Sequence, residues 1–474
     1  MTRPPSTLLL DALANLLGPK GFTVDAEIMA PWLTDWRGKY HGRAAAMLSP
    51  ATTDEVAAIV RMCAEAEVAL VPQGGNSGMV GGATPDASGN QLLLSLRRMN
   101  RIRHIDEAGQ LAVVEAGVIL ENFHNEVIPH GLRFPLTLGG KGSATIGGLV
   151  STNAGGTQVL RHGSMRTLTL GIEAVLPDGS IFDGLAPLKK DNRGYDLRHL
   201  FCGAEGTLGI VTAASLRLVP VAAARRTAWI GIDSPDSALL LLRRVDAAIG
   251  RELEGFELIP HSCLDAVLRH IPQTRAPLAA GQPWYVLLEL AGESDQALGE
   301  ALEQQLALAL DAGLIRDVVI AKNDRESEDF WRLRDSISEA ERAEGPALQH
   351  DISVPVDLMP AFIAENPLRL ALAFPGVRAL SFGHLGDGNV HHHVQPPIGA
   401  DGAAWLAEHG AAVGRLVYSH VLELGGSISA EHGIGQMKRD ILAELDSPAR
   451  LSALRGVKTG LDPAGLFNPG KLVA

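Results

Sequence analysis

Two glycine-rich segments constrain the fold of this chain more than any other feature of its sequence. The first contains Gly74, Gly75 and Gly78, and the second extends from Gly139 to Gly163 and is also rich in Ser and Thr. Each lies next to a predicted strand, and glycine lets backbone N–H groups approach phosphate oxygens there. Neither has the Walker spacing or the GxGxxG pattern. One such segment is equally well explained as a tight turn, whereas two favour binding of a large phosphate-containing cofactor.

Length and charge limit the classes of protein to be considered. At 474 residues the chain is too long for one ordinary core, so two or three domains are expected. Hydrophobic residues make up 46% and charged residues 20%, which is typical of a soluble globular protein. The formal net charge of -13 argues against a nucleic-acid-binding protein, which usually carries a basic patch.

Cysteines and apolar runs indicate the expected compartment. Cys63, Cys202 and Cys263 are scattered and odd in number, without a CxxC pair, so neither a disulfide framework nor a thiolate metal site is expected. The N-terminus has a short amphipathic pattern without a small-residue cleavage site, and no apolar run reaches membrane-spanning length. These features predict a cytoplasmic protein without a signal peptide or a transmembrane segment.

Glycine content and apolar periodicity predict the domain organisation. Short strands punctuated by glycine dominate up to residue 220, whereas longer helices alternate with strands after Val221. We expect a first domain over 1–220, a second over 221–415 and a C-terminal segment over 416–474. The expected helices are 53–67, 234–249, 294–313, 330–340 and 403–424, and the expected strands are 68–72, 91–96, 111–115, 172–176, 208–218, 284–290 and 318–320.

Two histidines and a distant Glu-His pair form the second informative pattern. His384 and His391 are separated by a Gly-Asp-Gly turn, and Glu431 and His432 follow far downstream. Two imidazoles and one carboxylate are a ligand set for a metal such as Zn²⁺ that leaves one coordination position open. His432 adjoins a ligand and is suited to moving a proton. Buried structural histidines are the alternative, which is favoured for a single histidine but not for this combination.

Three segments resemble the FAD-binding segments of the vanillyl-alcohol-oxidase / p-cresol-methylhydroxylase flavoprotein superfamily. They are Val71–Gly78, similar to the pyrophosphate loop of that superfamily, Gly142–Gly156 and Gly203–Thr212. The similarity continues through the histidine region and the tail Asn468–Lys471, so it covers nearly the whole chain. Within the superfamily the chain most resembles the FAD-linked D-2-hydroxyacid dehydrogenases, the D-lactate and D-2-hydroxyglutarate group.

The resemblance implies an α+β fold of two domains: an FAD-binding domain of the vanillyl-alcohol-oxidase type and a substrate, or cap, domain with an antiparallel sheet. It implies noncovalent FAD, because Asn76 stands where many members carry the histidine that forms a covalent link. The implied FAD-binding residues are Pro72, Gly74, Gly75, Asn76, Ser77, Gly78, Gly142, Ser143, Gly147, Gly148, Ser151, Thr152, Asn153, Gly155, Gly206, Ile210 and Asn468.

The resemblance also implies roles in catalysis. His384, His391 and Glu431 are the implied metal ligands, with zinc as the expected ion, and His432 is the implied catalytic base. A Lewis-acidic metal lowers the pKa of the substrate hydroxyl, so that His432 can accept its proton while flavin N5 takes the hydride from C2. Because Glu431 and His432 are adjacent, we expect a turn that lets both face the site.

The substrate carboxylate is expected to meet a helix. Arg334 and Ser338 are four residues apart in the predicted helix 330–340, and therefore on one face. Arginine grips a carboxylate bidentately, and a serine hydroxyl adds a donor. A solvated surface arginine is the alternative, and the family resemblance favours Arg334 and Ser338 as substrate ligands.

Two further implied substrate positions depart from the hydroxyglutarate-specific pattern. Gln349 stands where that pattern commonly has Lys, and His393 stands where it has Asn. D-2-hydroxyglutarate, D-lactate, D-malate and larger D-2-hydroxy acids are therefore all candidate substrates. In a strand, His393 would share the face of His391, whereas His392 would point to the opposite face.

The interpretation that combines these features is a dehydrogenase that oxidises a D-2-hydroxy acid to the 2-oxo acid. Its expected partners are the small-molecule substrate and a separate electron acceptor, such as an electron-transfer flavoprotein or a quinone, and a homodimer is considered. Three alternatives stay open: an oxidase of the same fold that reduces O₂, a zinc hydrolase that uses His384, His391 and Glu431, and a noncatalytic FAD-binding module.

Overall fold

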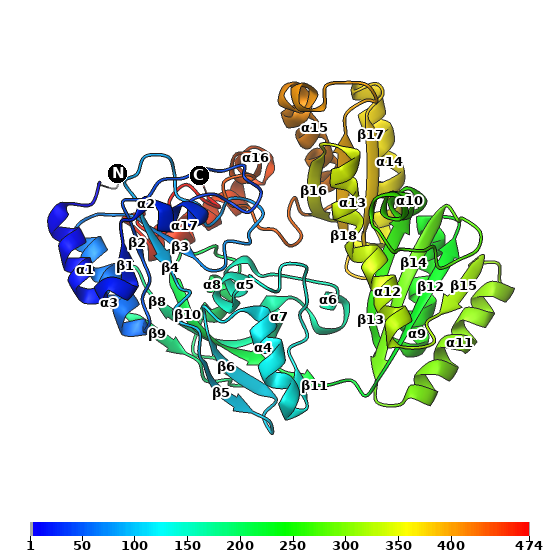
Figure 1. The fold of residues 1–474 in the computed structure, drawn as a ribbon, viewed down its shortest axis with the longest axis horizontal. Coiled ribbons are helices and arrows are strands. Elements are labelled where there is room, and N and C mark those ends of the chain that lie inside the picture. Colours follow the sequence, from blue (N-terminus) through cyan, green and yellow to red (C-terminus); the bar gives the residue numbers. More distant parts are fainter. Residues whose placement is uncertain (1–2, 474) are drawn as a thin grey trace. The chain divides into compact units, whose positions relative to one another are not determined.

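The structure, a computed structural model, describes residues 3–473 and divides them into two compact units. The first unit contains the residues up to 156, residues 162–221 and the C-terminal residues from 431. The second unit contains residues 157–161 and residues 222–430, and the latter are coloured green to orange in Figure 1. The chain leaves the first unit near the predicted boundary at 220. It returns at Glu431 and not at the predicted residue 416. Residue 416 lies inside the helix Gly402–Glu423 of the second unit.

A small sheet in the first unit contains three parallel strands, β2, β4 and β3, with β1 antiparallel at its edge. Helix α3 begins after Thr52, whose side chain accepts a hydrogen bond from the N–H of Glu55, and it buries its apolar face against this sheet. The elements are α1 (Thr7–Gly21), β1 (Phe22–Thr23), α2 (Ala26–Met29), η1 (Ala30–Trp32), β2 (Ala46–Leu48), α3 (Thr53–Glu65), β3 (Leu70–Gln73) and β4 (Leu92–Ser95).

A five-stranded antiparallel sheet of order β5-β6-β10-β8-β9 forms the rest of this unit, with α4 and α5 packed in its core. The elements are β5 (Ile102–Asp106), β6 (Leu111–Glu115), α4 (Leu120–Val127), η2 (Ile128–His130), β7 (Leu132–Arg133), α5 (Ile146–Thr152), α7 (Met165–Leu168), β8 (Thr169–Val175), β9 (Ile181–Gly184), α8 (Leu197–Phe201), β10 (Ile210–Arg217) and β11 (Val219–Pro220). Helix α6 (Val159–His162), between α5 and α7 in the sequence, belongs to the second unit except for His162.

The C-terminal segment completes the first unit. After α16 (Arg439–Leu445) and α17 (Pro448–Leu461), the buried Phe467 forms a parallel bridge with Leu70 of β3. The N–H of Asn468 then donates a hydrogen bond to the Leu70 carbonyl at 2.8 Å. The tail is therefore tied to the strand that precedes the first glycine-rich segment.

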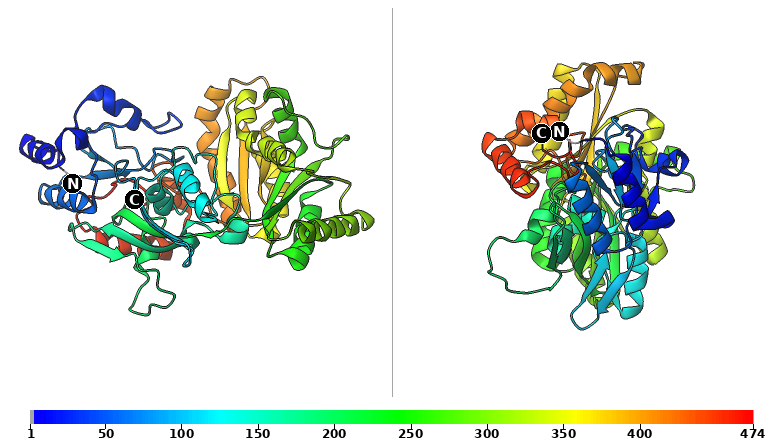
Figure 2. Two further views of the ribbon diagram at one scale, coloured as in Figure 1. Left: turned by 60° about the horizontal axis from the view of Figure 1, so that its bottom comes forward. Right: turned by 90° about the vertical axis from the view of Figure 1, so that its left-hand side faces the viewer.

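The second unit is built on a seven-stranded sheet of order β15-β12-β14-β13-β17-β18-β16, in which every pair is antiparallel. Helices α9, α11, α14 and α15 form one layer on this sheet, and α10, α12 and α13 form another on the opposite face (Figure 1; Figure 2). The strands are β12 (Ala224–Ile232), β13 (Leu253–Pro260), β14 (Trp284–Gly292), β15 (Asp317–Ile320), β16 (Leu348–Ser353), β17 (Arg378–His384) and β18 (Asn389–Gln395).

One predicted helix of this unit differs in the structure. The predicted helix 330–340 is two helices that meet at Ser336, so Arg334 and Ser338 do not share a continuous helical face. No glycine or proline marks this break, and the apolar pattern runs through it. The helices are α9 (Pro235–Ile249), α10 (His261–His270), α11 (Asp295–Asp311), α12 (Asp324–Asp335), α13 (Ile337–Glu344), η3 (Val356–Leu358), α14 (Met359–Ala373) and α15 (Gly402–Glu423).

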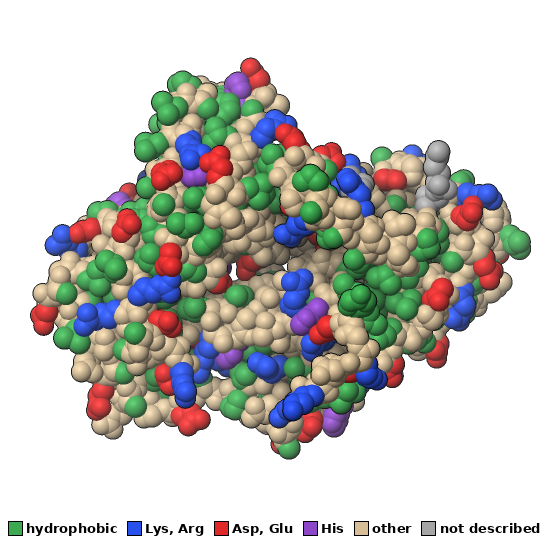
Figure 3. Space-filling model, turned by 180° about the vertical axis from the view of Figure 1, so that it is seen from behind, with side chains coloured by type: hydrophobic (Ala, Val, Ile, Leu, Met, Phe, Trp, Pro, Cys, Tyr) green, Lys and Arg blue, Asp and Glu red, His purple; other side chains and the backbone are tan. Residues whose placement is uncertain are grey.

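Surface and thiol features agree with the composition. Figure 3 shows acidic and basic side chains interspersed over one face of the molecule, without a continuous basic field. Within residues 3–473, no helix combines the length and the apolar character that a bilayer crossing requires. All three cysteines are unpaired and buried. Burial raises the pKa of the Cys63 thiol to about 12, so this group stays protonated and unreactive at neutral pH.

Candidate active site

The first glycine-rich segment forms a loop directly after β3, and its backbone amides are free. Among the described residues, the N–H groups of residues 74–78 donate no hydrogen bond to the protein. Successive free N–H groups form a concave anion site of the kind that binds phosphate. The loop is therefore suited to the pyrophosphate of FAD.

The first and second predicted FAD segments touch each other because glycines let their backbones approach. A Cβ atom at Gly75 would lie 1.7 Å from the backbone oxygen of Ser143, and one at Gly74 would lie 2.2 Å from Thr145 Oγ1. The Thr145 hydroxyl is buried and has no hydrogen-bond partner. A buried hydroxyl without a partner is costly unless a ligand supplies one. This cradle therefore fits a polar cofactor.

The third segment and the C-terminal tail meet at the same place in the first unit. Gly206 has a φ of +68°, and a Cβ atom there would lie 2.3 Å from Pro72 Cγ. Asn468 Nδ2 donates hydrogen bonds to the backbone oxygens of Gly82, at 2.8 Å, and Glu205, at 2.7 Å. Residues far apart in the sequence that were each predicted to bind FAD therefore lie together.

Glu205 is a residue of this site that the sequence analysis missed. Its carboxylate is buried and accepts hydrogen bonds from the N–H groups of Ile434, at 2.7 Å, and Gly435, at 2.8 Å. Burial raises the pKa of Glu205, and these two hydrogen bonds oppose the rise. Glu205 thus fixes the backbone immediately after Glu431 and His432. A charged residue inside a glycine-rich motif was the available signal.

The remaining predicted FAD residues occupy the same loops, several with structural contacts of their own. Asn76 has a φ of +53°, and its amide donates to the carbonyl of Thr34 at 2.8 Å. Asn153 caps α5 in the left-handed region, and the Ile210 side chain lies in the core. Thr152 Oγ1 donates to the backbone of Gly148. Ser77 and Gly78 belong to the free loop, Gly142 precedes α5, and α5 itself or the turn after it contains Gly147, Ser151 and Gly155.

Replacing Gly75 by alanine is expected to release FAD. The new Cβ would overlap the Ser143 carbonyl, so the loop must shift, at a cost of about 1–3 kcal/mol or about 5- to 150-fold in affinity. The ratio of flavin to protein absorbance after purification and dialysis measures this loss. Gly139→Ala is the matched control, because a Cβ at Gly139 meets no atom within 4 Å. A Gly75→Ala protein that retains full flavin content would contradict the contact.

The three predicted metal ligands lie close together. His384 ends β17, a four-residue turn follows, and His391 lies on β18. The two ring centroids are 5.5 Å apart, and the ligand atoms of His384, His391 and Glu431 all lie within 4.8 Å of one another. Glu431 directly follows Ala430, whose N–H contacts the Asp351 carbonyl of β16 at 3.4 Å. This donor set suits a divalent metal such as zinc.

Glu257 is a second residue of the site that the sequence analysis missed. It lies on β13, opposite His384 in the register, and its Oε1 is 2.5 Å from His384 Nδ1. Its Oε2 accepts a hydrogen bond from Arg334 Nε at 2.8 Å. A carboxylate on one ring nitrogen orients the imidazole and leaves Nε2 for a metal. The available signal was a charged residue in a strand where every residue is buried.

Electrostatic effects in this cluster fix the charge states of two groups. Burial alone would raise the pKa of Glu257, but the charges of Arg334 and His384 outweigh it and lower the pKa to about 2. Burial and the nearby charges of His384 and Arg334 lower the pKa of His391 well below its ordinary value. Glu257 is therefore an anion and His391 a neutral imidazole at pH 7, the forms that ion pairing and metal ligation need.

The predicted substrate residues separate into two groups. Arg334 is largely buried and lies beside the cluster, with Nη2 3.3 Å from His384 Nε2. Gln349 and His393 are cross-strand partners on β16 and β18, and the rings of His391 and His393 both flank Phe382. Ser338 is exposed on α13. The expectation that His393 shares the face of His391 is confirmed, whereas the helical argument for Ser338 is not supported.

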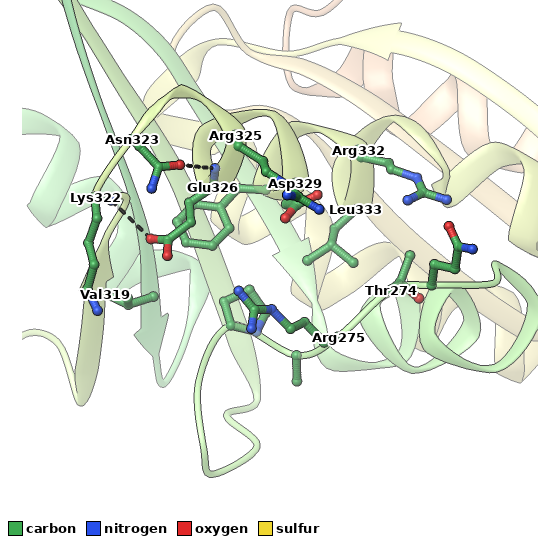
Figure 4. Close-up of a pocket in the computed structure, with 14 residues that line it drawn as sticks. Thr274, Arg275, Val319, Lys322, Asn323, Arg325, Glu326, Asp329, Arg332 and Leu333 are labelled. Atoms are coloured by element: carbon green, nitrogen blue, oxygen red, sulfur yellow. Dashed lines mark hydrogen bonds between the residues drawn. The ribbon is translucent and has the colours of Figure 1, made fainter.

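Two further features lie outside this cluster. His392 is fully buried on the opposite face of β18, against His350 and Phe362, as the strand alternation predicts. The hollow in Figure 4 lies between α12 and the loop at Thr274–Pro277, with exposed charged side chains such as Arg275 around it. None of the predicted ligand or substrate residues lines this hollow, so we assign it no catalytic role.

Comparison with protein families agrees with the predicted cofactor site. Residues 44–184 match the FAD binding domain family. Residues 221–472, more than half of the chain, match the C-terminal domain of FAD linked oxidases. The chain belongs to the FAD-linked oxidase family. It is therefore an FAD-dependent oxidoreductase, and the resemblance drawn from its motifs is confirmed.

Relatives of this FAD-linked oxidase family member extend over nearly its whole length. The mitochondrial D-2-hydroxyglutarate dehydrogenase of Arabidopsis thaliana is 38% identical over 97% of this chain and 80% of its own length. The mitochondrial enzyme of the same name from Bos taurus is 37% identical, covering 99% and 85%. D-2-hydroxyglutarate dehydrogenase of Xanthomonas citri pv. viticola is 37% identical, covering 92% and 91%.

Solved structures of other flavoproteins have the same fold as this chain. p-Cresol methylhydroxylase superposes with a TM-score of 0.73 at 14% identity, covering 98% of this chain and 96% of its own. 4-Ethylphenol oxidase from Gulosibacter chungangensis superposes with a TM-score of 0.72 at 20% identity, covering 99% and 98%. The predicted α+β fold of the vanillyl-alcohol-oxidase type, with an antiparallel sheet in the cap domain, is confirmed.

Proposed function

We propose that this chain is a metal-dependent dehydrogenase that oxidises a D-2-hydroxy acid to the 2-oxo acid and passes the electrons to a separate acceptor. The observation that carries the proposal is the grouping of His384, His391 and Glu431 beside the largely buried Arg334. This set offers a metal site and a carboxylate partner at one place, which is what a 2-hydroxy acid presents. The names of the D-2-hydroxyglutarate dehydrogenase relatives support the same substrate class.

Each residue of the site has its own role in the proposed reaction. Arg334 pairs with the substrate carboxylate and so fixes the orientation of C2. His432 accepts the hydroxyl proton as the C2 hydride leaves, which balances the two-electron oxidation. Bound FAD supplies the hydride acceptor at N5, and a divalent ion, which we propose to be zinc, supplies a Lewis acid. Glu257 keeps His384 and Arg334 in place, and Glu205 fixes the backbone after His432.

The proposal also covers the electron acceptor, the oligomeric state and the cellular compartment. We infer an electron-transfer flavoprotein or a quinone as acceptor, because the relatives are named dehydrogenases rather than oxidases. Oxygen consumption that keeps pace with substrate turnover would instead identify an oxidase. Three buried, unpaired cysteines support a reducing cytoplasm as the compartment, and a homodimer is the proposed assembly.

Anaerobic mixing of the holoenzyme with D- and L-2-hydroxy acids tests the proposal. We expect at least one D-acid, and not its L-isomer, to bleach the flavin absorbance band, and chelation of the metal to abolish the bleaching. We expect His432→Ala to slow the reduction by about 10²- to 10⁴-fold, the usual contribution of a general base. Flavin content provides the control, because this substitution leaves the FAD loop intact.

Three outcomes would contradict parts of the proposal. A flavoprotein that no 2-hydroxy acid bleaches would remove the substrate class. Bleaching that survives complete removal of metal would remove the metal role. A His432→Ala protein that reduces its flavin at the normal rate would remove the assignment of the base.

A further inference from the structure

Glu341 on α13 places an unexplained negative charge beside the predicted substrate residues. Its side chain is 3% exposed, and Oε2 lies 2.5 Å from His393 Nδ1. Its other oxygen, Oε1, is buried and has no hydrogen-bond partner. A buried carboxylate with one unsatisfied oxygen costs stability, so an unassigned Glu341 calls for a functional account.

The position of this pair relates it to the metal ligands within the second unit. His393 follows His391 by two residues on β18, and both rings pack against Phe382, with centroids 5.3 and 5.1 Å away. Gln349 is the direct cross-strand partner of His393, so its side chain leaves the sheet on the same face. Glu341, His393 and Gln349 therefore form a wall next to the proposed site of C2 oxidation.

The charges on this wall leave no positive group for a second carboxylate. Gln349 is neutral, and Glu341 places a carboxylate 2.5 Å from His393 Nδ1. Arg334 is the cation that contacts the neighbouring cluster, and Glu257 already pairs with it at 2.8 Å. Asp351, opposite His391 in the register, adds another carboxylate to this face. A substrate carboxylate buried here would lose its hydration without gaining a counter-charge.

We propose that Glu341 and His393 are a specificity-determining pair that selects D-2-hydroxy acids with an uncharged side chain. The inference rests on the proposed function and narrows its substrate class. The Glu341 Oε1 atom, which is buried and has no hydrogen-bond partner, remains available for an uncharged polar group or a water molecule. The Glu341 carboxylate repels a second carboxylate.

Pairs of acids with equal numbers of carbons, in which a carboxylate replaces a terminal methyl group, test this inference on the holoenzyme. D-2-hydroxypentanoate and D-2-hydroxyglutarate have five carbons each, and D-2-hydroxybutyrate and D-malate have four. We expect kcat/KM for the uncharged member of each pair to exceed that of the diacid by about tenfold or more, since one uncompensated charge is worth at least that factor. The dissociation constants of 2-oxopentanoate and 2-oxoglutarate, measured from shifts of the flavin band, should differ in the same direction.

A charge reversal provides the matched variants. Glu341→Gln combined with Gln349→Lys leaves a positive charge on the wall, and it is expected to shift the diacid-to-monoacid ratio of kcat/KM by about tenfold or more toward the diacid. Glu339→Gln is the control, because Glu339 is exposed on the same helix and carries the same side chain. This control should leave the ratio unchanged.

The possible results separate the inference from the proposed function. Diacids that are oxidised as well as, or better than, their monoacid partners would overturn the inference and leave the proposed function intact. An unchanged ratio in the folded double variant would do the same, and if that variant does not fold, the wild-type kinetic and binding comparisons still decide. Failure of every 2-hydroxy acid to reduce the flavin would overturn both.

Discussion

Replacing Glu431 by glutamine is expected to empty the metal site and lower the rate of flavin reduction by about 10³-fold. The amide keeps the shape of the side chain but loses the charge of the only carboxylate in the ligand group. A Lewis acid is worth several kcal/mol to the transition state, and each 1.36 kcal/mol corresponds to a factor of ten. Metal content per protein, measured by elemental analysis, and anaerobic flavin reduction are the two readouts.

Glu423→Gln on α15 is the matched control for this variant. Glu423 is a solvent-exposed carboxylate that pairs with Arg369 at 2.7 Å, and it has no part in the ligand group. It should keep normal metal content and turnover, because exposed ion pairs contribute little. A Glu431→Gln protein with normal metal content and normal turnover would refute the metal site.

The local patterns of the sequence predict much of the fold. Helix α3 and strand β6 lie where the apolar periodicity places them, and α9 begins after Ser234, a side-chain cap followed by proline. Such elements are predictable because their burial pattern and caps are encoded within a few residues. The break at Ser336 is not, because no glycine or proline marks it and the apolar pattern continues from α12 into α13.

Some residues of the candidate site can likewise be predicted from local sequence, and others cannot. His384 and His391 are recognisable because a short turn joins them, and their residue types are those of metal ligands. Glu257 reaches His384 only through the pairing of β13 with β17, strands that are distant in the sequence. Its partner cannot be read from spacing, although a carboxylate in a fully buried strand shows that some partner must exist. The contact of Glu341 with His393 could not be predicted either, because it joins α13 to β18, which are distant in the sequence.

Replacing Glu257 by glutamine is the second change with a large expected effect. The substitution removes the carboxylate that pairs with the largely buried Arg334 at 2.8 Å, and breaking a buried ion pair costs about 3–5 kcal/mol of stability. It also removes the acceptor that holds His384 Nδ1, so zinc affinity should fall by about 10- to 100-fold. Thermal unfolding of the second unit and competitive zinc titration measure the two effects.

The effect of Glu257→Gln on stability is expected to depend on pH. The folded-state pKa of Glu257 is lowered to about 2 from an ordinary 4.5, so its ion pair stabilises the fold fully above pH 4.5, and this contribution is lost as the pH falls toward 2. The stability difference between wild type and Glu257→Gln should therefore be largest near neutral pH and shrink on acidification through that range. Glu293→Gln, an exposed change just after β14, controls for loss of one negative charge.

Stability and metal affinity together distinguish two roles for Glu257. Lower stability with unchanged zinc affinity would mean that the carboxylate only neutralises Arg334, and that other contacts orient His384. Lower zinc affinity with unchanged stability would mean that Arg334 finds solvent or another partner once the carboxylate is gone. Loss of both is expected, because one carboxylate bridges the two groups through separate oxygens at 2.5 and 2.8 Å. A variant that matches wild type in both measurements would show that this bridge is not required for the proposed site.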